Sequence, residues 1–523
     1  MAIYREPVST NKILSKENYG IFALFIITAV VVYLLPKTIS QAYFILLLLI
    51  FYQSKKSYFW IAFFFILVSQ PAGFFTGSTA SDMQRIPMYS FGKGFSFSFY
   101  DLFFMTSIVK AIFTPQPKYS YFFKSSLKVL VIYGIVLLIN SFSLGMSLPS
   151  MILIGRTTFF PFLFFLIIPR FIPDYSHFIK LFRLLLPFII LSFIGQVYEI
   201  SYGKYIISIF KSGPSTIAST GAALAEGSED VSRVFDASFL NTFSLIVSGI
   251  LLIRGDRNFK PLFLIVIIFL NFLICFTSAT RGPFLTFSVI MFTIVIYIFF
   301  SSGWRLQYFR YFMFAFILLI VGKIALNSAD VLNTQIERSS ERFGTIEILF
   351  SGDASLKGEN ARTERRIPRL LKKFNESPII GWGFSDEGIE YQDGHVGFHN
   401  MLREGGILEI AVFLLFFFQM ISRMNKISKR PGILLSERNG FRLAIVSIFA
   451  LMITHATSAQ YFGYFVGFES NEKWVMLSLL FVGFSAFYHQ TNLEINNRLT
   501  ARYNENNNPV RGNGNPLTRR NRV

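Results

Sequence analysis

The sequence predicts an all-α polytopic membrane protein. Of the residues, 53% are hydrophobic and only 15% are charged, whereas an ordinary soluble domain is about 25% charged. Apolar segments recur along the whole chain, and each approaches the roughly 20 residues that a membrane-spanning helix needs. Lys and Arg gather in alternate connections between these segments, as expected for a chain that crosses a membrane repeatedly. About fourteen transmembrane helices fit these observations.

The apolar segments give the position of each predicted helix along the chain. They lie at 20–36, 39–54, 58–75, 97–114, 127–145, 150–169, 183–199, 239–254, 261–279, 283–300, 311–327, 406–422, 442–459 and 474–489. No small-residue cleavage signature closes the first segment, so we expect this helix to be retained. Residues 1–489 are therefore expected to form a single transmembrane domain, with a large outer loop at 328–405 between helices 11 and 12.

The distribution of charge predicts the orientation of the helices. With the N-terminus inside, more than half of the 49 basic residues fall in the inner connections, while the outer side is close to neutral. The positive-inside rule thus accounts for the net charge of +19. Because this charge is spread over many short connections and forms no single patch, nucleic-acid binding is not expected. Residues 490–523, rich in Asn, Arg and Gly, are expected to be a disordered basic cytoplasmic tail.

Two outer segments, 200–238 and 328–405, are too long to be simple connectors, so function should be sought there. Arg281 follows the ninth span directly and lies at the outer mouth of a helix pair. It either reaches toward lipid head groups or clamps an anion, because a guanidinium can form two parallel hydrogen bonds to phosphate. Arg156 lies deep within the sixth apolar run, where a charge needs either a cavity or a partner such as Asp101.

The outer loop contains a basic amphipathic segment at 360–374. Its apolar residues Ile367, Leu370, Leu371 and Phe374 have helical spacing, and Pro368 stands near the start of the helix that they predict. The opposite face is basic and includes Arg362, Arg365 and Arg366. Such a helix is attracted to anionic lipid, or its arginines face inward and hold a lipid-linked phosphate.

The end of the same loop is rich in turn residues and contains two of the five histidines. Residues 377–384 (Ser-Pro-Ile-Ile-Gly-Trp-Gly-Phe) cannot continue a helix. His395 and His399 have the i, i+4 spacing of helical zinc ligands, but Gly394 and Gly397 argue against a helix, and no further ligand is evident. We therefore expect no metal. The single cysteine, Cys275, excludes an intrachain disulfide and a CxxC pair.

The chain contains no phosphate-binding loop, nucleophile elbow or HExxH motif. An enzyme on the outer face has no access to ATP, so it must use a substrate that is already activated. No cofactor is expected.

Taken together, Thr280-Arg281-Gly282, the loop with Arg362, residues 377–384 and His399-Asn400 before a Gly-rich helix start resemble the O-antigen ligase and Wzy-type polymerase superfamily. The resemblance covers roughly residues 230–425 and includes Arg233. It implies a fold of the membrane glycosyltransferase C type, with the outer loop lying over a cavity. It also implies that a glycan is transferred from undecaprenyl pyrophosphate to a sugar hydroxyl with inversion of the anomeric centre and without a metal.

This chemistry matches the candidate residues. Arginines 156, 233, 281, 362, 365 and 366 would bind the substrate and neutralise its pyrophosphate. His399 is the expected catalytic base, with His395 in a secondary role, because a histidine can take a proton near neutral pH.

Three functions remain open at this point. A repeat-unit polymerase would join two undecaprenyl-pyrophosphate-linked oligosaccharides, a ligase would transfer the glycan to lipid A core or another acceptor, and a flippase or other transporter would catalyse no transfer. The expected location is the bacterial inner membrane, with the active site facing outward. Membrane lipid, a chain-length regulator and a flippase are the expected partners.

Overall fold

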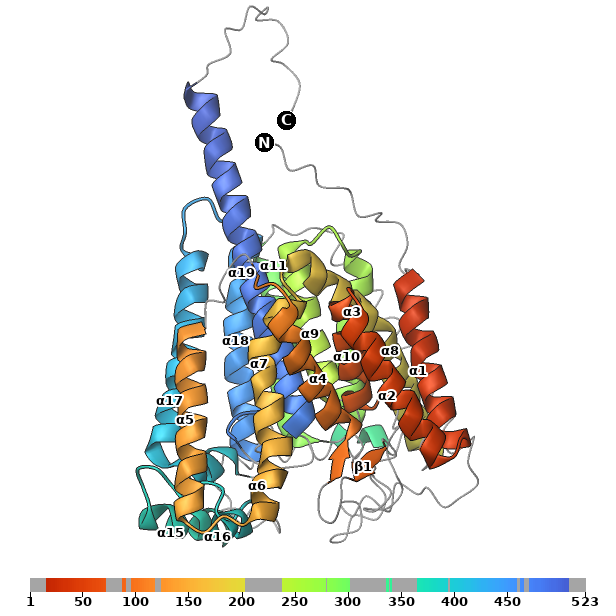
Figure 1. Cartoon of the computed structure of the whole chain (residues 1–523). Helices are drawn as coiled ribbons and strands as arrows, with labels where there is room; N and C mark the ends of the chain where they lie inside the picture. Colours follow the sequence, from red (N-terminus) through yellow and green to blue (C-terminus); the bar gives the residue numbers. More distant parts are fainter. Residues whose placement is uncertain are drawn as a thin grey trace, which may run out of the picture.

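The protein is described by a computed structural model that covers residues 16–71, 87–90, 96–117, 124–202, 238–278, 280–301, 335–337, 339–340, 365–393, 396–458, 461–464 and 470–507. Within these ranges the regular secondary structure is helical apart from one short antiparallel hairpin, in which Met88 pairs with Ser98. Figure 1 shows the helices packed side by side in one bundle.

The elements follow the predicted spans along the chain. They are α1 (Lys16–Leu34), α2 (Lys37–Gln53), α3 (Ser57–Ser69), β1 (Met88–Ser90), β2 (Ser96–Ser98), α4 (Phe99–Phe113), α5 (Lys124–Ser143), α6 (Leu148–Ile154), a π-helical segment (Gly155–Phe159), α7 (Phe160–Phe171), α8 (Tyr175–Tyr202), α9 (Ser238–Arg254), α10 (Pro261–Thr277), α11 (Arg281–Ser301), α15 (Ile367–Glu376), α16 (Asp386–Glu390), α17 (Gly397–Ser428), α18 (Leu435–Ser458) and α19 (Ser470–Asn507). Every predicted span overlaps a helix except the eleventh, at 311–327, which lies outside the described residues.

The helices divide into those that form the centre of the bundle and those that form its rim. Every residue of α9 from Phe239 to Ile253 is buried, and α3 is buried nearly all round. A helix that is hydrophobic on all sides is expected to lie inside a bundle. By contrast, α1, α2 and α5 expose apolar side chains such as Leu34, Leu49 and Ile139. Large exposed apolar side chains on helices of this length are suited to contact with lipid.

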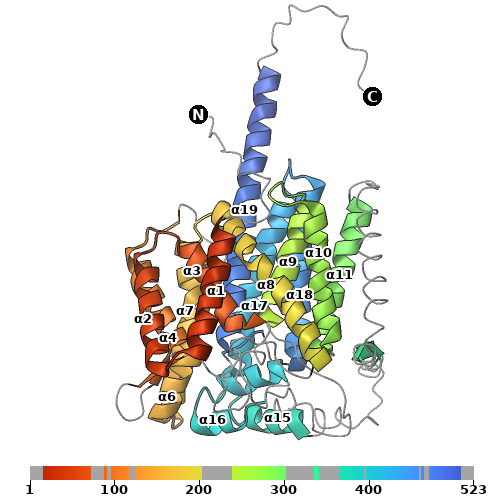
Figure 2. The same ribbon diagram turned by 90° about the vertical axis from the view of Figure 1, so that its right-hand side faces the viewer.

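Six helices of the described part are long and apolar enough to span a membrane, and further apolar helices of 10–17 residues accompany them. The protein is therefore an all-α multi-pass membrane protein, as the sequence predicts. α15, α16 and the hairpin lie at one end of the bundle, and α19 projects from the opposite end (Figures 1 and 2). We call the end with α15 and α16 the loop end.

The prediction that the tail is disordered is wrong for residues 490–507, because α19 continues as one helix to Asn507. Both polar contacts and apolar burial hold this part of the helix. Arg498 forms two hydrogen bonds with the carboxylate of Glu437, at 2.7 and 2.8 Å, and the side chain of Ile495 is fully buried. Asn492 accepts a hydrogen bond from Arg430 in the connection that follows α17. Residues 508–523 lie outside the described residues.

α17 also differs from the prediction, since it begins at Gly397, nine residues before the predicted start at 406. The glycines at 394 and 397 therefore do not prevent a helix from forming around His399. At Gly406 the backbone has φ 63° and ψ −159°, which interrupts the helix. We call this interruption the α17 break and the residues before it, 397–405, the leading segment.

Candidate active site at the loop end

The α17 break is closed by the turn-rich stretch at 377–384. Trp382 and Gly383 donate their backbone N–H groups to the carbonyls of Arg403 and Glu404, at 2.9 and 2.7 Å. In the other direction, Ile407 and Leu408 donate to the carbonyls of Pro378 and Ile379, at 2.9 and 3.2 Å. Backbone groups buried in a membrane need partners, and this stretch supplies them where the helix is interrupted.

Glycines in both segments make this close approach sterically feasible. A Cβ atom at Gly381, where φ is +72°, would lie 2.4 Å from the Glu404 carbonyl oxygen. A Cβ atom at Gly406 would lie 2.3 Å from the Ile379 carbonyl oxygen. Both positions combine a left-handed backbone with contact to another main chain, so a larger residue would be strained there.

His399 lies in the first turn of α17 and is half-buried. The next residue, Asn400, is buried and fastens the chain before the helix: its Oδ1 accepts from the Asp393 N–H at 3.0 Å, and its Nδ2 donates to the Asp393 carbonyl. The Asp393 carboxylate in turn lies 3.5 Å from Nη1 of Arg366. Asp393 thus connects an arginine of the predicted basic face to the turn that carries His399.

The predicted amphipathic helix is present as α15, with Pro368 in its first turn. Leu370 on its apolar face is buried, and Arg365 on the preceding turn is exposed. The helix packs against α17. Arg369 donates a hydrogen bond to the Glu390 carbonyl at 3.0 Å, which ties α15 to the end of α16.

Lys373 anchors α15 to the rest of the loop end, although it belongs to the basic face of the helix. Only 3% of it is exposed. Its ammonium group forms ion pairs with Glu376 at 2.7 Å and with Glu387, and lies 3.4 Å from the centre of the Trp382 ring. Burial acts to lower the pKa of Lys373, but the hydrogen bonds that its ammonium group donates to Glu376 and Glu387 outweigh burial and raise the pKa above its usual value.

α16 is connected to the start of α6. The Asp386 carboxylate accepts hydrogen bonds from the Ser147 N–H and hydroxyl, at 3.3 and 3.2 Å. A hydrogen bond from Ser150, with those from Ser147, holds the pKa of Asp386 below its usual value. The loop end is therefore fixed to the bundle through α6 as well as through α17.

Arg156 forms the ion pair that the sequence analysis gave as the alternative to a substrate role. Its Nε and Nη2 both lie 2.9 Å from Oδ2 of Asp101, which also accepts from the Ser98 N–H at 2.6 Å. Arg156 lies in the π-helical segment between α6 and α7. Such segments widen a helix locally and are frequent at functional sites.

The other predicted site residues are only partly placed. Arg281 is the first residue of α11, so its backbone begins that helix, but its side chain is not described. His395, Arg233 and Arg362 lie outside the described residues. Among the described residues, no group of three His, Cys, Asp or Glu side chains is arranged to hold a metal ion.

The structure also reveals a buried polar cluster that the sequence analysis did not identify. Arg403 and Glu404 are each 1% exposed and Glu409 is fully buried, all on α17 around its break. Nη2 of Arg403 lies 3.6 Å from Glu404, and Nη1 donates to the Gly388 carbonyl of α16. The charge of Glu409 within the predicted span at 406–422 is the signal that could have indicated the cluster.

His455, near the loop end of α18, supports the first turn of α17 from behind. It is buried, its Nδ1 accepts from the Phe462 N–H at 3.2 Å, and its ring stands edge-on to that of Phe398 at 5.0 Å. A Cβ atom at Gly397 would lie 2.6 Å from its Nε2. His455 therefore packs directly against the turn that carries His399.

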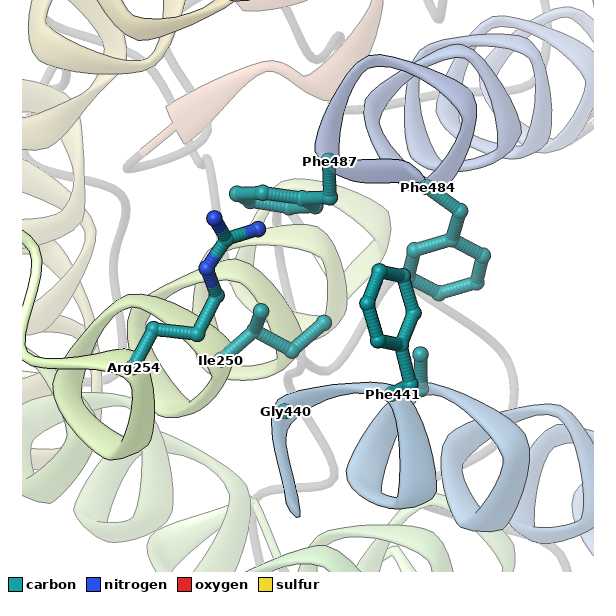
Figure 3. Close-up of a pocket in the computed structure, with 7 residues that line it drawn as sticks. Ile250, Arg254, Gly440, Phe441, Phe484 and Phe487 are labelled. Carbon is teal, nitrogen blue, oxygen red and sulfur yellow. The ribbon is translucent and has the colours of Figure 1, made fainter. Parts of the chain in front are cut away.

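A pocket at the opposite end of the bundle differs in character. It lies between α9, α18 and α19 and is lined by Phe441, Phe484 and Phe487 with Arg254 at one side (Figure 3). The Arg254 guanidinium lies 5.0 Å from the centre of the Phe487 ring. The lining contains no candidate base or nucleophile, so the loop end remains the better candidate for an active site.

Residues 263–403 match a family model described as O-Antigen ligase. The matched range contains Arg281, the basic helix, residues 377–384 and His399-Asn400, whereas Arg156 and Arg233 precede it. No curated protein matches the chain. Members of the family are membrane glycosyltransferase-like enzymes that act on lipid-linked oligosaccharides. The match supports the resemblance to the O-antigen ligase and Wzy-type polymerase superfamily that the sequence predicts.

Proposed function

We propose that this protein is a polysaccharide repeat-unit polymerase. It transfers an undecaprenyl-pyrophosphate-linked glycan to the non-reducing-end hydroxyl of a second lipid-linked repeat unit, with inversion and without a metal. The reaction takes place at the loop end, which faces the outside of the bacterial inner membrane. The basic connections at the opposite end support this orientation.

One observation carries the proposal: Asp393 joins the basic helix to the turn with His399. The carboxylate of Asp393 pairs with Arg366, and its backbone is held by Asn400, the neighbour of His399. One ion pair and two hydrogen bonds thereby join a candidate anion-binding arginine to the residue next to the candidate base. An enzyme that transfers a group from a pyrophosphate to a hydroxyl needs both a cation and a base.

The chemistry follows from these groups. His399 accepts the proton of the acceptor hydroxyl while that oxygen forms a bond to the anomeric carbon. The bond from this carbon to the pyrophosphate oxygen breaks, and the pyrophosphate leaves with the electron pair. Arg281, Arg365 and Arg366 stabilise its developing charge. Because the donor and the acceptor both carry a diphosphate, a polymerase needs a second anion site, for which Arg233 and Arg362 are the candidates.

Ligation to lipid A core or another acceptor is the second candidate function, and the description of the matching family favours it. The two reactions share the donor and the chemistry and differ only in the acceptor. A polymerase lengthens lipid-linked glycan when no other acceptor is present, whereas a ligase does not.

The test uses purified full-length protein in vesicles with defined lipid-linked repeat units. We expect a ladder of longer lipid-linked products, and we expect His399→Ala to lower the rate by about 10²–10⁴-fold, the usual contribution of a general base. His395→Ala should lower it less. Transfer only to an added lipid A core acceptor would show a ligase, and substrate movement across the membrane without any transfer would show a transporter. Full turnover by His399→Ala would contradict its role as the base.

A further inference from the structure

A buried carboxylate lies beside the α17 break on the membrane side. Glu409 follows the break by three residues and is fully buried. Its Oε1 accepts from the Tyr464 N–H at 3.4 Å, and its Oε2 has no hydrogen-bond partner among the described residues. An ionisable side chain within a membrane span costs free energy, so its presence there indicates a functional role.

Two glycines leave the space that the Glu409 side chain occupies. A Cβ atom at Gly405 would lie 2.5 Å from both Cβ and Oε2 of Glu409. A Cβ atom at Gly463, where φ is +81°, would lie 3.3 Å from its Oε1. The side chain of Glu409 therefore lies between the main chain of the leading segment and the segment 461–464 that precedes α19, and any larger residue at Gly405 would displace it.

A second helix contacts the same point. Tyr133 of α5 donates its hydroxyl to the carbonyl of Gly405, the residue immediately before the break. Both Tyr133 and Glu409 thus contact Gly405, Tyr133 through the carbonyl and Glu409 against the Cα. Gly405 is the last residue of the leading segment, and the same segment carries His399 and Asn400.

We propose that Glu409 and Tyr133 are positioning residues that hold the α17 break and thereby fix the leading segment for glycosyl transfer. This inference rests on the proposed function, but it assigns neither residue a contact with substrate. The stretch at 377–384 closes the break from the loop end, and Glu409 and Tyr133 support it from within the membrane. A residue that only filled space would affect the amount of folded protein and leave the turnover of each folded molecule unchanged.

The first test separates kcat from KM in three variants. Displacing a reacting group by about 1 Å can cost 100-fold in rate, so we expect Glu409→Leu to lower kcat by about that factor with KM nearly unchanged. Glu409→Gln keeps the shape and an acceptor for the Tyr464 N–H, and should stay within about tenfold of wild type. Tyr133→Phe removes one hydroxyl and should lower kcat by about tenfold.

Two variants serve as matched controls. Tyr43→Phe removes another hydroxyl that is hydrogen-bonded within the bundle, 2.8 Å from Oγ1 of Thr28 and far from the break. Glu437→Leu removes another buried carboxyl, at the end of the bundle opposite the loop end. Both should turn over like wild type once activity is corrected for the amount of folded protein.

The second test needs no activity. The only cysteine, Cys275, is fully buried, so a cysteine introduced elsewhere can be labelled selectively. Leu402→Cys places a half-buried reporter in the leading segment. In Glu409→Leu we expect its reaction with maleimide to become about tenfold faster, because the segment opens locally more often. Glu409→Gln should label at the wild-type rate.

The two tests distinguish the inference from the function on which it rests. If the wild-type protein transfers no glycan, the proposed function fails, and the labelling rates still show whether Glu409 holds the break. If Glu409→Leu matches wild type both in kcat and in the labelling of Leu402→Cys, the positioning role is wrong. A loss in Glu409→Leu that Glu409→Gln shares fully would also contradict it, since the role depends on shape and on an acceptor oxygen.

Discussion

Asp393 is the residue at which the two halves of the candidate site meet. Its carboxylate forms an ion pair with Arg366, and its backbone N–H and carbonyl form two hydrogen bonds with the Asn400 side chain. Neither contact requires Asp393 to touch substrate. The short polar side chain of Asn400 is needed because it must both donate to and accept from one peptide group. His399-Asn400 therefore combines a candidate base with the residue that fixes its surroundings.

Lys373 gives a prediction at the same scale. Lys373→Met keeps most of the volume but removes cation–π contacts with Trp382 and Tyr391 and two half-exposed ion pairs, so it should destabilise the packing of α15 by about 1–2 kcal/mol. Hydrogen exchange of the α15 and α16 amides should become faster by about 5- to 30-fold, the factor that this loss of free energy gives. Lys372→Met, the exposed neighbour on the same helix, is the control and should change little. Equal effects of the two substitutions would show that Lys373 is not an anchor.

At the scale of elements, the broken helix α17 and the projecting helix α19 decide how the two ends of the molecule differ. α17 reaches beyond its apolar span at the loop end, where its leading segment is held by residues 377–384. α19 extends beyond the bundle at the opposite end (Figure 1). The leading segment of α17 and residues 490–507 of α19 are both polar segments. Each is helical because specific side chains hold it, and an apolar face alone would not keep it helical.

The pair of Arg498 and Glu437 gives the prediction for α19. Arg498→Ala removes two hydrogen bonds to a buried carboxylate and should destabilise residues 490–507 by about 1–3 kcal/mol. Hydrogen exchange should become faster there and in the connection between α17 and α18, while glycan transfer at the loop end stays unchanged. Arg502→Ala, an exposed site one turn further along, should have little effect. Unchanged exchange in Arg498→Ala would mean that the ion pair does not hold the helix.

At the scale of the whole molecule, the loop end and the end with α19 should face opposite sides of the membrane. Asn375→Cys lies on α15 and Arg502→Cys on α19, both at exposed positions, and Cys275 is buried. A maleimide that cannot cross membranes should label Asn375→Cys in spheroplasts and Arg502→Cys only after permeabilisation, because the basic connections stay inside. Labelling of both from the same side would contradict the orientation, and the reverse pattern would place the candidate site inside.

Membrane spans could be predicted from the sequence because apolar length is a local property of the chain. For the same reason the basic amphipathic helix was predicted at 360–374 and found as α15, and residues 377–384 were predicted to be non-helical. The partners of buried charges depend on which helices pack together. Asp101 and Arg156 are 55 positions apart, so from the sequence their pairing was only one of two alternatives, and the packing of the helices decided for it. The family resemblance directed attention to His399 and could not show that Asn400 fixes Asp393.

The sequence by itself determined the fold class and the positions of the apolar segments that form helices, and it predicted the segment that carries the candidate site, since these follow from composition, periodicity and spacing. Only the tertiary structure decided that α17 breaks at Gly406, that residues 377–384 close the break and that Glu409 is buried beside it. It also decided that α19 continues as a helix to Asn507. These features arise from contacts between residues that are distant in sequence. Such contacts form only when the helices pack together.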